Sequence, residues 1–152
     1  MASPFPFTSG QVLTAAQLNS IGEATAFTPS WTNFTPGNAV ESWHYVQVNE
    51  WLYFSGQTVL GSTSSVTGFM EIDFPVGTQL GENGVVVGTA LYFDVGSFVR
   101  RAGVLDQSGD DIRFFYYSVV GSLIGVATTS ATAPFTFATT DIIQASGAVL
   151  LA

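Results

Sequence analysis

The side chains that could do catalytic chemistry are few in this sequence. It contains one histidine, His44, and neither cysteine nor lysine. Nucleophilic catalysis needs a nucleophile with a base beside it, and the base needs a poised partner. His44 lies between Trp43 and Tyr45 in a strand-like segment, where we expect a packing or surface role. The sequence also lacks a GxSxG turn that would expose a catalytic serine.

Carboxylates could act in pairs at two places. Glu71 and Asp73 alternate onto one face of a predicted strand, and Asp110 and Asp111 share a turn that follows Asp106. Glycoside hydrolysis needs two carboxyl groups roughly 5–10 Å apart across a cleft. No pattern indicates a cleft, acids in turns are commonly solvated, and the turn lacks the spacing of a calcium loop. We therefore predict no catalytic residue, no metal site and no cofactor.

Aromatic side chains are the remaining candidates for recognition. In the segment 51–55 aromatic and aliphatic residues occupy both faces of the predicted strand, which predicts burial on both faces. The segment 114–120 has the same character. Aromatic residues concentrate in interface cores, although an exposed set could also stack on sugar rings. The residues predicted to form a subunit interface or a ligand platform are Trp43, Trp51, Tyr53 and Tyr116.

Composition and charge restrict the possible partners. Charged residues make up 9% of the chain, against roughly 25% in a typical soluble domain, whereas hydrophobic residues make up 47%. We interpret this surface as largely covered by other subunits, although Ser, Thr, Asn and Gln could also solvate a monomer. With three arginines and a net charge of −8, binding to nucleic acid or an anionic membrane is not expected. The sequence shows neither a signal peptide nor a membrane-spanning apolar run.

The elements that must position these residues begin with an N-terminal arm. Residues 1–12 are rich in Pro and Phe and predict an extended segment. Thr14 and Gln17 fit a capping box, which predicts a two-turn helix over about 15–21. So short a helix is unstable alone and must dock, either on its own domain or on a partner. The predicted anchoring residues are Phe5, Phe7, Leu13, Leu18 and Ile21.

From residue 26 onward the sequence predicts strands separated by turn residues. The clearest pair, 40–48 and 51–61, is joined by Asn49-Glu50 as a tight hairpin. Further strands are predicted at 67–74, 84–94, 97–105, 111–120, 123–128 and 142–151. About eight or nine strands without intervening helices predict an all-β fold, an antiparallel β-sandwich in jelly-roll style. We expect two parts, the arm and helix at 1–25 and the β-sandwich domain at 26–152.

Several segments resemble small bacteriophage virion proteins, the decoration, head-fibre, minor-tail and tail-fibre-tip proteins of phages with double-stranded DNA. The segments are VLTAAQLNSIGEA, FTPSWTNFTPGNA, HYVQVNEWLYFSGQTVLGS, MEIDFPVG and PFTFATTDIIQASGAVLLA. The chain departs from that pattern at Asn49-Glu50, in place of a Gly-containing turn, and at Thr140-Asp141, in place of Gly-Asp. Neither departure affects a catalytic residue, because the family has none.

The resemblance implies a non-enzymatic homotrimer on the virion, made in the host bacterial cytoplasm and anchored by its N-terminal arm. Its partners would be further copies of itself and other virion proteins, such as major capsid or tail proteins. A single domain without a long shaft favours a capsid decoration or head-fibre protein. The alternative is a tail-fibre or minor tail protein that binds a host-surface receptor or carbohydrate. A glycan-cleaving enzyme that uses Glu71 and Asp73 is the third hypothesis.

The hypotheses differ in what they expect at the end remote from the N terminus. A receptor binder should cluster exposed Trp or Tyr there. A decoration protein should grip its partner through the N-terminal arm and should carry no special cluster in its distal loops. An enzyme should show two carboxylates that face each other across a cleft.

Overall fold

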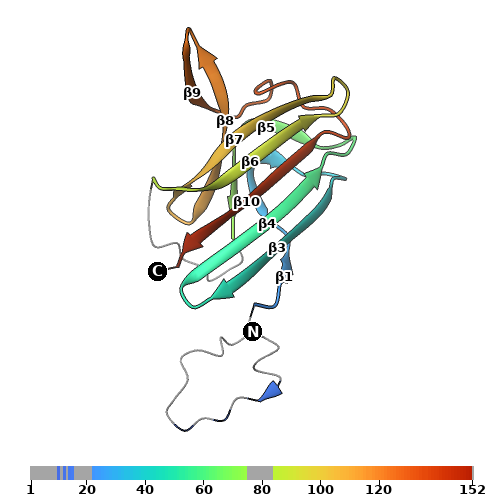
Figure 1. Ribbon diagram of the computed structural model, residues 1–152. Helices are drawn as coiled ribbons and strands as arrows, with labels where there is room; N and C mark the ends of the chain where they lie inside the picture. The colour runs from blue at the N-terminus through green and yellow to red at the C-terminus, as the bar shows by residue number, and fades with distance from the viewer. Residues whose placement is uncertain (1–9, 11, 13, 16–21, 75–83, 152) are drawn as a thin grey trace.

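A computed structural model describes residues 10, 12, 14, 15, 22–74 and 84–151 of the chain (Figure 1). Within this part all regular elements are β-strands, and no helix is long and apolar enough to cross a membrane. The strands, in chain order, are β1 (Thr25–Phe27), β2 (Ser30–Thr35), β3 (Val40–Val48), β4 (Trp51–Val59), β5 (Ser65–Asp73), β6 (Val86–Asp94), β7 (Val99–Ser108), β8 (Asp111–Val120), β9 (Leu123–Thr128) and β10 (Ile142–Leu150).

The all-β prediction is confirmed, and the predicted helix is not seen. Except for Ala15, the range 15–21 lies outside the described residues, as do the predicted anchoring residues. Each predicted strand range has a counterpart, and those at 40–48, 111–120 and 123–128 have the predicted bounds. Strands β1 and β2 were not among the predicted ranges. Both are short, and Pro29 separates them, which removes a hydrogen-bond donor where the chain changes direction.

All strand pairs are antiparallel, and the main path of the sheet is β1-β3-β4-β10-β6-β7-β8-β5-β2, with β9 attached to β8. The last strand, β10, lies in the middle of this order, between β4 and β6. The strands therefore form one curled sheet resembling a half-barrel. The predicted division into the two separate sheets of a jelly-roll sandwich is not confirmed.

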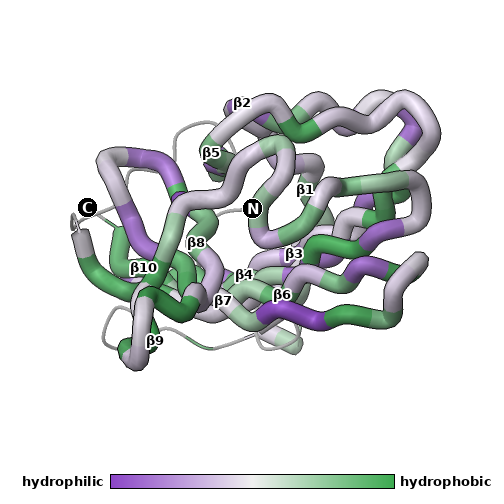
Figure 2. The backbone as a smooth tube through the Cα atoms, turned by 90° about the horizontal axis from the view of Figure 1, so that it is seen from above, coloured by the Kyte–Doolittle hydropathy of each residue, from purple (hydrophilic) through white to green (hydrophobic). Residues whose placement is uncertain are grey.

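The curl brings the far strands of the sheet onto one shared core. Figure 2, a view from above, shows β2 and β5 lying across from β4 and β6. Trp31 of β2 packs edge-on against Trp43 of β3, with ring centroids 5.8 Å apart. The Trp31 indole Nε1 also donates a hydrogen bond of 2.7 Å to Glu41 Oε1. These contacts join β2, the last strand of the hydrogen-bonded order, to β3, the second strand from its other end, so the interior is enclosed without a second sheet.

Trp43 is the largest fully buried side chain of this core. Its indole Nε1 donates to Thr58 Oγ1 at 3.0 Å, which satisfies the one polar atom of the ring. Gly56 lies directly opposite it on β4. A Cβ at Gly56 would come within 2.0 Å of the indole, so this position accommodates Trp43 only because it has no side chain.

Strand β8 leaves the sheet halfway along its length. It pairs with β7 only as far as Phe114, and from Phe115 to Val120 it pairs with β9. Gly103 of β7 makes the departure possible, because a Cβ there would come within 1.9 Å of the Phe115 carbonyl oxygen. The β8–β9 hairpin, residues 115–128, projects from the body in Figure 1. We call these residues the β8–β9 arm.

Buried hydrogen bonds hold the base of the β8–β9 arm to the body. The hydroxyl of Tyr92 donates to the Phe115 carbonyl at 3.0 Å, and burial raises the pKa of this phenol. The Thr129 hydroxyl accepts from the Met70 amide at 2.9 Å and donates to the Phe114 carbonyl at 3.3 Å. The arm therefore begins at a fixed point on the core.

The loop that follows the β8–β9 arm returns the chain to the centre of the sheet through Asp141. This carboxylate is buried and accepts from the Ala138 amide at 2.8 Å and from the Val95 amide at 3.0 Å. Thr140, which directly precedes Asp141, has φ of 75°. A β-branched residue rarely adopts this conformation, and the bonds of Asp141 help to hold it.

Candidate functional site

The β8–β9 arm exposes more apolar side chains than any other described part of the chain. Its five large aliphatic residues are between 54% and 77% exposed: Val119, Val120, Leu123, Ile124 and Val126. Neither strand of the arm carries a charged residue between 115 and 128. An exposed apolar surface of this kind marks an interaction site in a soluble protein.

Both faces of the β8–β9 arm carry large apolar side chains. Tyr117 stands opposite Val126 and Val119 opposite Ile124, so these four large side chains share one face. The other face carries Val120 opposite Leu123 next to the turn and the small pair Ser118 and Gly125. Among the described strands β9 pairs with β8 alone, so its outer edge has no hydrogen-bonded neighbour. Free edges and apolar faces are both features through which sheets join other chains.

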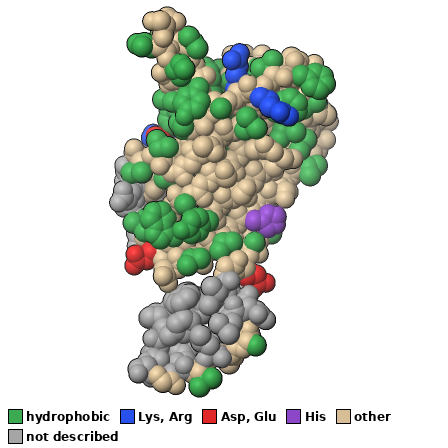
Figure 3. Space-filling view, viewed as in Figure 1, with side chains coloured by type: hydrophobic (Ala, Val, Ile, Leu, Met, Phe, Trp, Pro, Cys, Tyr) green, Lys and Arg blue, Asp and Glu red, His purple; other side chains and the backbone are tan. Residues whose placement is uncertain are grey.

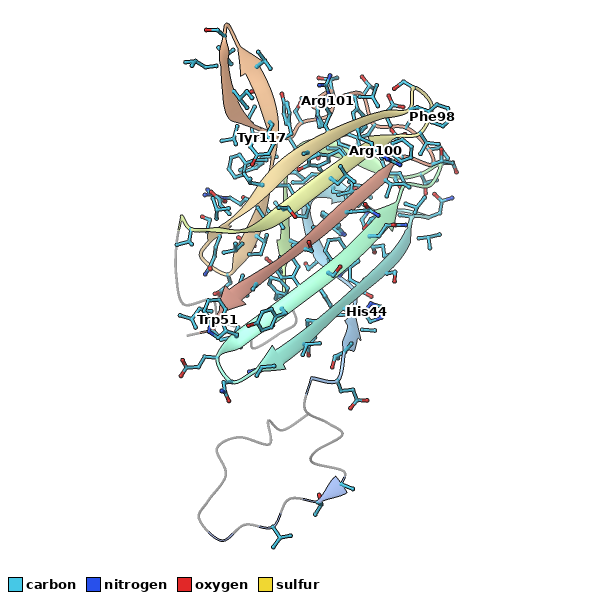
Figure 4. The ribbon with its side chains drawn as sticks, in the orientation of Figure 1. His44, Trp51, Phe98, Arg100, Arg101 and Tyr117 are labelled. Atoms are coloured by element: carbon cyan, nitrogen blue, oxygen red, sulfur yellow. The ribbon has the colours of Figure 1, made fainter. Side chains whose placement is uncertain are left out.

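A second exposed apolar surface, which is aromatic, lies at the opposite end of the molecule on the outer face of β4. Trp51 and Tyr53 are 46% and 50% exposed, and their ring centroids lie 6.5 Å apart in a tilted arrangement with an interplanar angle of 32°. Val46 and Val48 of β3 are their cross-strand partners. Figure 4 shows Trp51 at this end and Tyr117 on the arm at the other end. We call the outer surface around Trp51 and Tyr53 the β4 patch.

The four aromatic residues predicted as one set are thus divided by the structure. Trp51 and Tyr53 lie together at the surface, but Trp43 is 1% exposed in the core and cannot meet a partner there. Tyr116 is half-buried against the core at the base of the β8–β9 arm. The β4 patch lies at the end where β1 begins, because Thr25 pairs with Tyr45 close to the β3–β4 turn.

A shallow polar depression adjoins the β4 patch on the outer face of β4, β10 and β6. It has a volume of about 290 Å³ and is lined by Ser55, Thr89, Ala90, Leu91, Gln144, Ala145 and Ser146. His44 lies on the same outer face, opposite Ser55, and is exposed. Hydroxyl and amide groups beside an aromatic pair form the kind of surface on which sugars bind, so this face could serve as a ligand platform.

Glu71 and Asp73 lie on the outer face of β5, with Ile72 between them in the core. Asp73 stands directly opposite Asp111 of β8, and Glu71 opposite Arg113. These carboxyls lie side by side on neighbouring strands, and neither Glu71 nor Asp73 lines the depression described above. Among the described residues, no group of three or more His, Asp or Glu side chains is arranged to hold a metal ion.

Asp111 lies opposite Asp73 on the neighbouring strand and has a raised pKa. The hydrogen bond between the two side chains raises the pKa of Asp111 to about 7, with smaller contributions from partial burial and from the negative charge of Asp73 and Glu71. Arg113 is engaged nearby in a bidentate contact with Asp106, at 2.8 Å from Nε to Oδ1 and 2.7 Å from Nη2 to Oδ2. The carboxylates of β5 and β8 and the Arg113–Asp106 pair therefore form a cluster of charged groups on the protein surface.

Exposed charge is divided between the two ends of the molecule. Arg100 and Arg101 lie on β7 opposite Phe93 and Tyr92, close to the β6–β7 turn and so at the end that bears the β8–β9 arm. Glu50 occupies the β3–β4 turn next to Trp51, and Glu23 precedes β1. Figure 3 shows the basic side chains near the apolar arm and acidic side chains at the other end. Asp94 also lies at the arm end, where β6 meets the β6–β7 turn, so that end carries both signs of charge, whereas the end with the β4 patch exposes Glu50 and Glu23.

Comparison with protein-family models, curated proteins and solved structures gives no match for this chain. The β8–β9 arm and the β4 patch are the features of the described chain that bear on its function. Sequence reasoning placed the strand 123–128 but did not single out its aliphatic residues as a site. The signal was present, because VVGSLIGVA at 119–127 is apolar on both alternating faces and carries no charge.

Proposed function

We propose that this protein is a structural subunit of a bacteriophage virion, a homotrimeric capsid decoration or head-fibre protein anchored by its N-terminal arm. The observation that carries the proposal is the apolar β8–β9 arm, which projects from the body and whose residues 115–128 pair only with each other within the described chain. A two-stranded hairpin is marginally stable alone in water, so a surface like this favours a protein that works inside an assembly.

Composition and sequence pattern add support from independent directions. The charged fraction of 9% suits a chain whose surface is shared with neighbours. The resemblance of its segments to small virion proteins names the class of assembly. The curled sheet is compatible with the jelly-roll-like sandwich of that class, because β2 packs across the core from β3. The anchoring residues remain Leu13, Leu18, Ile21, Phe5 and Phe7, and the partners are virion proteins.

A receptor- or carbohydrate-binding tail protein is the second candidate, favoured by the neighbouring exposed rings of Trp51 and Tyr53 beside the polar depression. Their position argues against it. A receptor site is expected at the end remote from the N terminus, whereas the β4 patch lies where β1 begins. The remote end carries the aliphatic β8–β9 arm instead. A decoration protein is expected to carry no special cluster in its distal loops. The apolar β8–β9 arm differs from that expectation and therefore requires a binding partner of its own.

Gold-labelled antibody against the purified protein tests the virion assignment. Applied to the virus-sized fraction of material that carries this coding sequence, it should label particles at regular positions on the head. Regular labelling at the tail tip would support the receptor-binding candidate. Labelling of free protein alone would contradict both. Light scattering after size exclusion tests the trimer separately, with an expected mass about three times the 16.1 kDa of one chain.

A further inference from the structure

The exposed side chains of the β8–β9 arm define the kind of surface that could bind it. One of its faces carries Tyr117, Val119, Ile124 and Val126, so the covering surface must be largely apolar. Arg100 and Arg101 are exposed at the same end of the molecule, so acidic groups beside that surface would strengthen the contact.

The β4 patch meets both requirements and belongs to the same chain. Trp51 and Tyr53 supply an exposed aromatic surface, and Glu50 stands next to Trp51 in the β3–β4 turn. Within one molecule the β8–β9 arm cannot reach it. The arm projects from the end of β8 beyond Phe114, whereas Trp51 pairs with Leu150 at the opposite end of the sheet. The two surfaces can therefore meet only between molecules.

We propose that the β8–β9 arm of one copy docks on the β4 patch of a second copy. The inference rests on the proposed function and deepens it, since it names the surfaces through which subunits associate. The contact is heterologous, because each copy offers its arm to one neighbour and its patch to another. A heterologous contact closes into a ring when the rotation between copies allows it, and closure after three copies gives the proposed homotrimer.

Charge favours this pairing over the symmetric ones. Two arms placed together would bring Arg100 and Arg101 of both copies to one interface, and two β4 patches would do the same with Glu50. Like charges across an interface oppose association. The pairing of arm with patch sets Arg100 and Arg101 of one copy near Glu50 of the next.

Two double variants of the full chain test the proposal. Ile124→Ser with Val126→Ser weakens the arm, and Trp51→Ser with Tyr53→Ser weakens the β4 patch. All four side chains are about half exposed or more, so the body should stay folded, which urea unfolding checks. Each variant alone should raise the apparent dissociation constant for self-association at least ~10-fold, as loss of central apolar contacts does. The single variants Ile124→Ser and Tyr53→Ser replace any double variant that fails to fold.

Mixing the two variants gives the decisive result. An intact patch on the arm variant should meet an intact arm on the patch variant, so light scattering of the mixture should show dimers of one copy of each. An arm variant that is monomeric beside a patch variant that still associates, with no mixed dimer, would overturn the proposal in favour of arm–arm pairing. A monomeric wild-type chain would also overturn it, and neither result depends on whether antibody labels a virion.

Val40→Ser is the matched control. Val40 is 69% exposed, belongs to neither surface and carries the same kind of side chain as the arm. The mass of this variant should equal that of the wild type. A loss of association equal to that of the arm variant would show that general surface hydrophobicity, not the arm, drives assembly, and would overturn the proposal.

Discussion

At the scale of single residues, the contact between Trp43 and Gly56 shows how closely this core is packed. The buried indole of Trp43 occupies the space that a side chain at Gly56 would fill, so its burial requires glycine at that position. Aromatic burial contributes strongly to stability, and a displaced indole would also lose its bond to Thr58. The stability of the fold therefore depends on a residue that makes no side-chain contact itself.

Gly56→Ala should lower the free energy of unfolding by about 1–3 kcal/mol, the usual cost of overpacking a core. Urea unfolding followed by tryptophan fluorescence measures it. Gly125→Ala is the control, because a Cβ there meets no atom within 4 Å, and its effect should stay within about 0.5 kcal/mol. Equal stability of Gly56→Ala and the wild type would mean that Trp43 is not held against β4.

Asp111 gives the protein a pH dependence with a defined sign. Its pKa of about 7 in the folded chain lies above its ordinary value of 3.8, so the folded state holds a proton that the unfolded state has released. The free energy of unfolding contributed by this group is therefore greatest at acid pH and falls as the pH rises from about 4 to about 7.

Asp111→Asn should remove most of this fall and make the variant more stable than the wild type at about pH 8. Thermal unfolding at a series of pH values shows the difference. If Asp111→Asn keeps the wild-type profile, the raised pKa of Asp111 is not the source of the pH dependence.

At the scale of elements, the alternation of apolar and polar residues predicted where the strands lie but not which face of each strand is buried. The ranges of β3, β8 and β9 followed from runs of β-forming residues between turn residues. A strand with apolar residues on both faces does not reveal which face is inside, and so Trp51 and Tyr53 could not be distinguished from the buried Trp43. Whether the strands form one sheet or two depends on pairings between distant segments, such as Trp51 with Leu150, that no local pattern contains.

The β8–β9 arm behaves as an element separate from the core. No residue between 117 and 126 belongs to the buried cluster or packs against it. Replacing 117–126 by Asn-Gly should therefore join the register partners Tyr116 and Ala127 through a two-residue turn and leave the free energy of unfolding within about 1 kcal/mol of the wild type.

The same shortened chain should lose self-association, as seen by light scattering. Gly121-Ser122 replaced by Asn-Gly keeps the length of the β8–β9 arm and should retain association. A shortened chain that unfolds would show that the arm stabilises the body, and one that still assembles would show that the arm is not the contact.

At the scale of the whole molecule, the separation of charge makes assembly sensitive to salt. Arg100 and Arg101 lie at the arm end and Glu50 lies at the other, and salt screening weakens the attraction between them across the proposed contact. The dissociation constant for self-association should rise several-fold between about 50 mM and about 500 mM NaCl, which sedimentation equilibrium measures. Association that tightens with salt would point to apolar contacts without charge complementarity.

The order of the strands also governs how the protein can be made. Strand β10 separates β4 from β6 and supplies hydrogen bonds to both, although it is the last strand along the chain. A ribosome that has released β1 to β9 has therefore released two sheet fragments with unpaired inner edges, exposed to other nascent chains on the same message. Folding must wait for β10, so the fold forms after synthesis of this strand, and the interval before it arrives is when the chain is most open to aggregation and to chaperones.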